Sequence, residues 1–198
     1  MSQDNEKNGL EEYTNILSQD SCDKLIEMFN NDTRKEAGST AGGVSDNKIS
    51  TDLGCNFNDV MDTKYNNLIL PGIVSLVKNI KEEYDFLDWG VSFWNVSGDY
   101  NIQHYKDNEG YFAMHCEHSN KHQKRMMAWM IYLNDAKCGT IFPYQNTTIE
   151  AEKGKGVIWS AEWTHPHKGV TPNIGDKYIA TGWFDYYTPK ETKSKGFK

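Results

Sequence analysis

The chain has 198 residues, of which 21 are Lys or Arg and 28 are Asp or Glu, for a formal net charge of −7. This length is sufficient for one domain with its own buried core, so we expect residues 1–198 to form a single domain. The acidic balance excludes the broad basic surface with which nucleic-acid-binding proteins neutralise phosphates, so we expect no nucleic-acid partner.

The sequence shows no feature that directs a protein to a membrane or a secretory route. Its first residues are polar and acidic, without the apolar stretch of a signal peptide. The most apolar run, residues 68–77, is short and contains Pro71 and Gly72, so it does not predict a membrane span. We expect a cytoplasmic protein without a membrane partner. Four cysteines without a CxxC pair are typical of free thiols in a reducing compartment, and they are Cys22, Cys55, Cys116 and Cys138.

The front half of the chain predicts helices joined by one long polar segment. Residues 1–12 are polar, and we expect them to be disordered. Residues 18–32 combine Ser and Asp caps with apolar residues at helical spacing. Residues 32–59 are rich in Gly, Ser, Asn and Asp, which in a compact domain is typical of a functional loop or lid. Residues 59–87 predict further helix, interrupted at a Pro-Gly pair.

From residue 89 to residue 187 the sequence consists of short segments rich in β-branched and aromatic residues. Gly, Asn, Asp and Lys turns separate the segments at the spacing of an all-β sandwich or barrel. Helices at the front and strands at the back predict an α+β fold. Its core is expected to be a double-stranded β-helix (jelly roll) over residues 89–187, flanked by N-terminal helices.

All six histidines lie in this β-rich half, and one cluster has the spacing of a metal site. In "FAMHCEH", His115 and Glu117 are two residues apart, so on a strand they share one face and Cys116 points to the other. One His and one carboxylate are two thirds of the facial triad that binds non-haem Fe(II) and leaves three positions open. One alternative is a packed or surface histidine beside a solvated carboxylate. Another is a zinc site of Cys116 with His118 or His122, for which the sequence has no second ligand pair.

A third ligand is expected from "WTHPHKGV", the other histidine cluster. His165 and His167 have the same parity across Pro166, so strand alternation does not separate them, but the spacing to Lys177 and the following Gly169 favour His167. Lys177 lies ten residues after His167, at the start of a predicted strand. A 2-oxoglutarate-dependent oxygenase requires such a cation near its iron. The cosubstrate chelates iron through its C1 carboxylate and keto oxygen, and its far carboxylate needs a positive partner.

Five segments between residues 95 and 187 extend this pattern: "IQHYKDNEGYFAMHCEH", "RMMAWMIYLND", "GTIFP", "KGKGVIWSAEWTHPHKGV" and "GDKYIATGWF". In this order they resemble the Fe(II)/2-oxoglutarate oxygenases of the prolyl 4-hydroxylase type. The resemblance implies that His115 and Glu117 are the proximal metal ligands and that His167 is the distal one. It also implies a double-stranded β-helix.

The same resemblance implies a cosubstrate pocket. Lys177 corresponds to the basic residue that binds the C5 carboxylate of 2-oxoglutarate, and Tyr132 corresponds to the tyrosine that assists it. Tyr105 corresponds to a tyrosine of the same pocket, and Trp183 to an aromatic residue of the last strand. Strand parity agrees, because Lys177 and Trp183 share a face. The alternatives are ordinary barrel packing for the three aromatic residues and a surface position for the lysine.

Two positions depart from the family's pattern. Glu117 stands where the family has the shorter Asp, so its strand has to lie slightly farther from the ion. The family's "GGE" turn is "KCGT" here, and we assign no function to Cys138.

The sequence therefore predicts an Fe(II)/2-oxoglutarate-dependent dioxygenase that hydroxylates a C–H bond. Its cofactor would be Fe(II), its cosubstrates 2-oxoglutarate and O2, and ascorbate an optional reductant. By resemblance, the substrate is a prolyl residue in a peptide or protein, and the alternative is a free amino acid or another small molecule. A non-catalytic metal-binding or anion-binding jelly-roll module is the competing class, and a hydrolytic zinc enzyme is a third.

Overall fold

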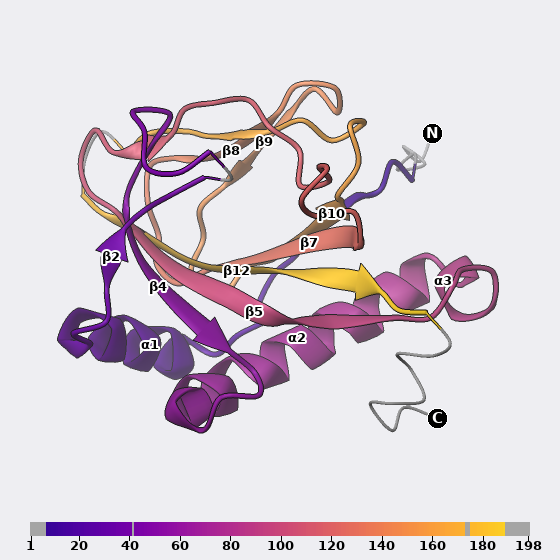
Figure 1. The fold of residues 1–198 in the computed structure, drawn as a ribbon, viewed down its shortest axis with the longest axis horizontal. Coiled ribbons are helices and arrows are strands. Elements are labelled where there is room, and N and C mark those ends of the chain that lie inside the picture. The colour runs from indigo at the N-terminus through magenta and orange to yellow at the C-terminus, as the bar shows by residue number, and fades with distance from the viewer. Residues whose placement is uncertain (1–6, 41, 173–174, 189–198) are drawn as a thin grey trace.

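The computed structural model describes residues 7–40, 42–172 and 175–188 (Figure 1). Its main element is a seven-stranded antiparallel sheet with the strand order β1-β10-β7-β12-β5-β4-β2. In chain order these strands are β1 (Leu10–Tyr13), β2 (Glu36–Ala37), β4 (Thr51–Asn56), β5 (Trp94–Tyr105), β7 (Arg125–Tyr132), β10 (Gly156–Ser160) and β12 (Lys177–Tyr186).

Two smaller sheets lie opposite the large one (Figure 1). One has the order β11-β8-β9 and consists of β8 (Gly139–Phe142), β9 (Thr147–Glu150) and β11 (Lys168–Gly169). The other pairs β3 (Lys48–Ile49) with β6 (Gly110–Tyr111). The facing sheets form the double-stranded β-helix that the sequence predicts.

Helices cover the other face of the large sheet, where α1 and α2 lie beneath it in Figure 1. The helices are α1 (Gln19–Asn31), the 3-10 turn η1 (Val60–Asp62), α2 (Thr63–Glu83) and α3 (Phe86–Trp89). Helix α1 begins after Ser18, whose side chain accepts a hydrogen bond from the Ser21 amide, and it buries Cys22, Leu25 and Phe29 at helical spacing. The expected α+β class with N-terminal helices is confirmed.

Strand alternation divides the core into two parts, one on each face of the large sheet. On β7, Trp129 and Ile131 belong to the core against the helices. Ala128, Met130 and Tyr132 alternate with them and belong to the core between the sheets. The period of two in this apolar strand therefore sets which residues reach the inter-sheet space, where the candidate site lies.

Three expectations about the front half are wrong in detail. Residues 10–12 belong to strand β1 rather than to a disordered segment; residues 1–6 lie outside the described residues. The polar segment 32–59 contains β2, β3 and β4, because β4 pairs with β5 over six positions. Helix α2 continues through Pro71, and the adjacent Gly72 packs closely, since a Cβ there would lie 3.0 Å from Ile131 Cδ1.

Among the described residues, no helix combines the length and the apolar character that crossing a bilayer requires.

Candidate active site

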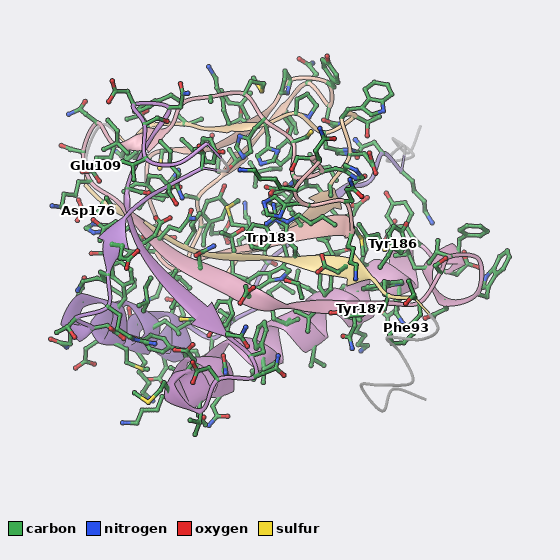
Figure 2. The ribbon with its side chains drawn as sticks, viewed as in Figure 1. Phe93, Glu109, Asp176, Trp183, Tyr186 and Tyr187 are labelled. Carbon is green, nitrogen blue, oxygen red and sulfur yellow. The ribbon has the colours of Figure 1, made fainter. Side chains whose placement is uncertain are left out.

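A cavity of about 460 Å³ lies between the large sheet and the smaller sheets. Its walls come from β4, β5, β7, β10 and β12 on one side and from β3, β6, β8 and β11 on the other. Trp183, labelled in Figure 2, extends from β12 into this space, on the side of the sheet opposite the helices. The cavity contains the three predicted metal ligands and three of the four predicted cosubstrate residues.

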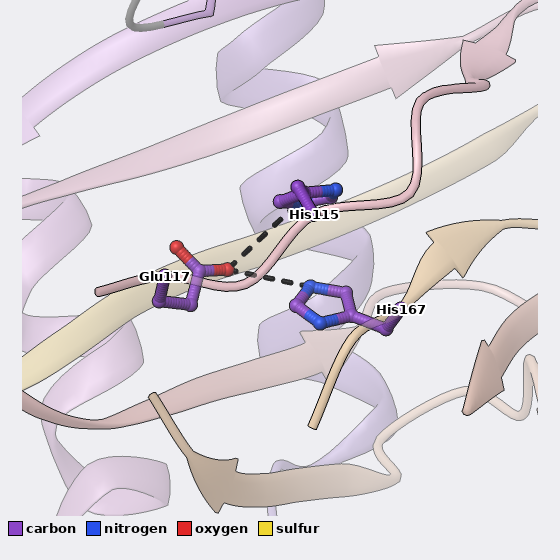
Figure 3. Close-up of side chains that lie close together, drawn as sticks. All are labelled: His115, Glu117 and His167. Atoms are coloured by element: carbon purple, nitrogen blue, oxygen red, sulfur yellow. Dashed lines mark ion pairs between the residues drawn. The ribbon is translucent and has the colours of Figure 1, made fainter. Parts of the chain in front are cut away.

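The structure brings His115, Glu117 and His167 together in one wall of the cavity (Figure 3). His115 and His167 form an isolated antiparallel bridge, with amide-to-carbonyl distances of 3.1 and 2.8 Å in the two directions. His115 is therefore in a bridge and not in a continuous strand, but it projects to the same side as Glu117. The Glu117 Oε1 atom lies 3.4 Å from Nε2 of His167 and 4.0 Å from Nε2 of His115.

Backbone carbonyl groups orient both imidazole rings. Nδ1 of His115 lies 3.0 Å from the carbonyl oxygen of Ala113, and Nδ1 of His167 lies 3.0 Å from that of His165. Because a carbonyl only accepts, each Nδ1 carries a proton, so Nε2 is the nitrogen that the neutral ring offers to a metal. Burial and the neighbouring His167 lower the pKa of His115 to about 4, so this ring is neutral at neutral pH.

The second carboxylate oxygen of Glu117 is held by two other side chains. The indole Nε1 of Trp183 donates to Glu117 Oε2 at 2.7 Å, and Arg125 Nη1 lies 3.3 Å from the same atom. The Arg125 guanidinium stacks 3.6 Å from the centre of the Trp183 ring. Burial raises the pKa of Glu117, but the neighbouring His167 and His115 rings and the Trp183 hydrogen bond outweigh it and lower the pKa to about 2. Glu117 is therefore an ionised group with Oε1 directed to the histidines.

Three atoms with this chemistry and spacing fit one transition-metal ion. All candidate ligand atoms lie within 4.8 Å of one another. Metal bonds to His nitrogen and carboxylate oxygen are about 2.0–2.2 Å, so ligands of one ion lie roughly 3–4 Å apart. Two imidazoles and a carboxylate are the donor set of non-haem Fe(II) sites.

Lys177 lines the same cavity as a buried cation, 3% exposed. Its Nζ lies 4.7 Å from the centre of the Tyr105 ring and 3.4 Å from the carbonyl oxygen of Val170. Burial lowers the pKa of Lys177. Within the described part of the chain, no carboxylate lies within ion-pair distance of Lys177. Gly169 packs against the amine, since a Cβ there would lie 3.4 Å from Nζ.

The two predicted tyrosines have different positions. Tyr105 lines the cavity, and its hydroxyl donates to Gln103 Oε1 at 2.7 Å. Tyr132 does not line the cavity: its hydroxyl lies 2.9 Å from Oγ1 of Thr140 and 3.3 Å from the carbonyl oxygen of Ile149. Thr140 occupies the cavity wall in front of it. Trp183 lines the cavity, and its indole contacts the carboxylate of the metal trio.

The remaining histidines and cysteines are not part of the trio. Both ring nitrogens of His165 have partners, at 2.9 Å from Thr164 Oγ1 and 2.9 Å from the Asn8 carbonyl oxygen. His118 pairs with Glu162 at 3.1 Å. His122 lines the cavity, which its position in a polar turn did not predict. Cys138 is buried in the inter-sheet core, and no function had been assigned to it.

Several cavity residues had no clear signal in the sequence. Arg125 is the one charged residue of the apolar strand "RMMAWMIY", and this contrast is the sequence signal that could have identified it as a cavity residue. Lys48 and Asp52 lie in the polar segment 32–59, where no periodic pattern distinguishes them. Gln103 follows the parity of Tyr105 on β5.

The fold and the donor set define the class of double-stranded β-helix proteins that bind a non-haem metal ion. Residues 100–185, which include the metal trio, match the family model of the 2OG-Fe(II) oxygenase superfamily. This region, with its metal trio, has the features of a 2-oxoglutarate-dependent dioxygenase, whose cofactor is Fe(II) and whose cosubstrates are 2-oxoglutarate and O2. Comparison with curated proteins gave no match at the sequence level.

Solved structures of prolyl hydroxylases share the fold. A viral collagen prolyl hydroxylase from Paramecium bursaria Chlorella virus-1, in complex with 2OG, is 18% identical with a TM-score of 0.65, covering 91% of this chain and 98% of that one. A Pseudomonas putida prolyl-4-hydroxylase is 15% identical with a TM-score of 0.66, covering 90% and 94%. A Trichoplax adhaerens prolyl hydroxylase, in complex with a hypoxia inducible factor peptide fragment, is 16% identical with a TM-score of 0.66, covering 95% and 87%. At these identities the likeness concerns the fold.

Proposed function

We propose that this dioxygenase hydroxylates a C–H bond of a prolyl residue in a peptide or protein. In this proposal His115, Glu117 and His167 hold Fe(II), and Lys177 anchors 2-oxoglutarate. The observation that carries it is the buried Lys177 ammonium, which has no carboxylate partner among the described residues and lines the same cavity as the metal trio. A dicarboxylate that chelates the metal at one end would supply the missing anion at the other.

The prolyl substrate is proposed from the similar structures. Three proteins with this fold are described as prolyl hydroxylases, and one of them is in complex with a peptide fragment. A cavity of about 460 Å³ has room for a cosubstrate and one substrate side chain. The free amino acid or other small molecule that the sequence left open is the alternative substrate.

With Fe(II) bound, 2-oxoglutarate and O2 would supply an oxidative decarboxylation that yields succinate and CO2, with one oxygen atom of O2 in succinate and the other available for the substrate C–H bond. The protein's own residues would bind and orient the reactants. The Nε2 lone pairs of His115 and His167 and the Oε1 atom of Glu117 would form one face of the metal site. Trp183 and Arg125 would hold Glu117 Oε2, which directs Oε1 to the ion.

At the cosubstrate end, Lys177 would bind the far carboxylate, and the Tyr105 ring would pack beside it. We propose that Thr140 takes the place on the cavity wall that was expected for Tyr132, because Thr140 lines the cavity and Tyr132 supports it from behind. The buried walls would exclude water, which strengthens the contact between the lysine and the carboxylate.

We further propose that residues 1–198 form one domain that acts in the cytoplasm. The helix-side core extends from α1 and α2 to the strands of the large sheet, which supports a single folding unit. All four cysteines are free thiols, which suits a reducing compartment. Ascorbate is proposed as an optional reductant.

A substrate screen tests the proposal. Proline-containing peptides and free amino acids are incubated with the protein, Fe(II), 2-oxoglutarate and ascorbate, and the products are examined by mass spectrometry. We expect a mass gain of one oxygen on proline within a peptide. Hydroxylation of free amino acids alone, with no product from any peptide, would contradict the proposed substrate class.

A further inference from the structure

A second polar cluster, the Lys48 cluster, lines the cavity apart from the metal trio and Lys177. It consists of Lys48 on β3, Asp52 on β4 and Gln103 on β5. The lysine and the aspartate precede residues 100–185, the part of the chain that matches the family model. The cluster is therefore contributed largely by the N-terminal segment that packs onto the jelly roll.

The carboxylate of Asp52 is occupied by donors from this chain. It accepts from Lys48 Nζ at 2.5 Å, from Ser50 Oγ at 2.7 Å and from Gln103 Nε2 at 3.3 Å. The Gln103 amide is fixed in this orientation, because its Oε1 accepts from the Tyr105 hydroxyl at 2.7 Å. A carboxylate with three donors has little capacity left for a substrate ammonium group.

The ammonium of Lys48, in contrast, retains donor capacity. Its side chain is 4% exposed. Within the part of the chain that the structure describes, its hydrogen-bond partners are Asp52 and the Ser39 carbonyl oxygen at 3.4 Å, beyond the usual range. An ammonium has three N–H donors, so at least one remains for a ligand in the cavity.

Lys48 is also close to the candidate metal site. Its Nζ lies 5.8 Å from the centre of the Tyr111 ring. That ring stacks on the His115 imidazole, with 3.8 Å between centroids and 9° between planes. The spare donor is thus separated from a proposed iron ligand by one aromatic ring.

The charge of the cluster determines which acceptor it favours. Lys48 and Asp52 neutralise each other, so an incoming carboxylate would be attracted by one and repelled by the other. A carbonyl oxygen is neutral and accepts a hydrogen bond from the ammonium without this repulsion. Lys177, which has no carboxylate partner among the described residues, is by contrast suited to an anion.

We infer that Lys48 binds a backbone carbonyl oxygen of the substrate, and that Asp52 disfavours a free carboxylate there. The cluster would select a residue inside a peptide over a free amino acid. This inference rests on the proposed function and deepens it, because it distinguishes between the two substrate classes that the sequence left open.

The test compares two probes that differ in charge at one position. One is acetyl-Ala-Pro amide, and the other is acetyl-Ala-Pro with a free carboxylate. The kcat/KM for a mass gain of one oxygen is measured for each probe, and the ratio of the two values is the readout. We expect the wild type to prefer the amide probe. Lys48→Met should lower kcat/KM for the amide probe by about tenfold or more, because a hydrogen bond from a charged donor is lost.

Asp52→Asn is the second variant and retains the lysine. It should shift the ratio by about tenfold toward the carboxylate probe, because one close charge is removed. A purely structural role of the pair would lower kcat/KM for both probes and does not predict such a shift in their ratio. Lys155→Met is the matched control. Lys155 is also buried and is paired with Glu12 at 3.0 Å, but it does not line the cavity, so the ratio should equal that of the wild type.

A wild type that favours the carboxylate probe, or an Asp52→Asn variant with an unchanged ratio, would overturn the inference and leave the proposed function standing. Failure of the wild type to hydroxylate any proline probe would overturn the proposed function and the inference with it.

Discussion

Trp183→Phe tests the proposed support of the metal site, because it removes one donor and keeps an aromatic ring. The lost contact is the 2.7 Å hydrogen bond from the indole to Glu117 Oε2, which leaves only the 3.3 Å contact of Arg125 on that oxygen. Residues that orient metal ligands typically contribute about 10–100-fold to metal affinity. We therefore expect the affinity for Mn(II), an oxygen-inert substitute for Fe(II), to fall by that factor.

The expected effect on thermal stability follows from linkage. With Mn(II) at a hundredfold excess over the wild-type Kd, binding stabilises the wild type by about 2.7 kcal/mol and the variant by about 0.4–1.4 kcal/mol. At about 2–4 °C per kcal/mol for a chain of this length, the metal-dependent rise in Tm falls from roughly 5–10 °C to roughly 1–6 °C. The assay is the difference in Tm between samples with Mn(II) and samples with a chelator.

Trp129→Phe is the control for losing an indole. Trp129 is fully buried in the helix-side core, and its Nε1 has no hydrogen-bond partner among the described residues. Its replacement should lower Tm equally with and without metal. If Trp183→Phe keeps the full metal-dependent rise of the wild type, the indole does not support the metal site, and the reasoning from the 2.7 Å contact is refuted.

Three further predictions concern the trio and the cosubstrate. His115→Ala and His167→Ala should each abolish 2-oxoglutarate turnover, whereas His122→Ala should retain it; loss in all three would contradict the assignment. Lys177→Ala should raise the KM for 2-oxoglutarate by at least about thirtyfold, because a desolvated charge-assisted contact is worth about 2–5 kcal/mol. The variant should still bind Mn(II). An unchanged KM would show that Lys177 does not bind the cosubstrate. Glu117→Asp should keep part of the metal-dependent rise in Tm and Glu117→Ala should lose most of it, and equal rises in the two variants would show that the carboxylate is not a ligand.

The sequence predicted those parts of the fold that depend on local periodicity. The aromatic and β-branched alternation of β7 and β12 determines which residues face the inter-sheet core, and the structure has the predicted parity. Strands β2 to β4 were not predicted, because their residues are polar and Gly-rich. They are ordered by pairing with β5 and β6, which are distant in the sequence. Pro71 predicted a break, but packing of the apolar face of α2 on the sheet holds the helix together.

The residues of the site likewise include some that local sequence patterns reveal and others that only the three-dimensional structure reveals. The His115–Glu117 spacing is local, so the sequence was sufficient to mark the pair. His165 and His167 differ only in three dimensions: the bridge to His115 brings His167 to Glu117, while both nitrogens of His165 have other partners. Arg125 could not be assigned, because its contact with Glu117 Oε2 depends on how β7 and the His115–Glu117 segment pack.

Iron-dependent succinate formation from 2-oxoglutarate tests the central claim most directly. The purified wild type, His165→Ala and His167→Ala are each supplied with 2-oxoglutarate, O2 and ascorbate, with and without Fe(II), and succinate is quantified. The account predicts succinate from the wild type and from His165→Ala only when Fe(II) is present, and none from His167→Ala. Succinate from His167→Ala at the wild-type rate, or its loss in His165→Ala alone, would contradict the account.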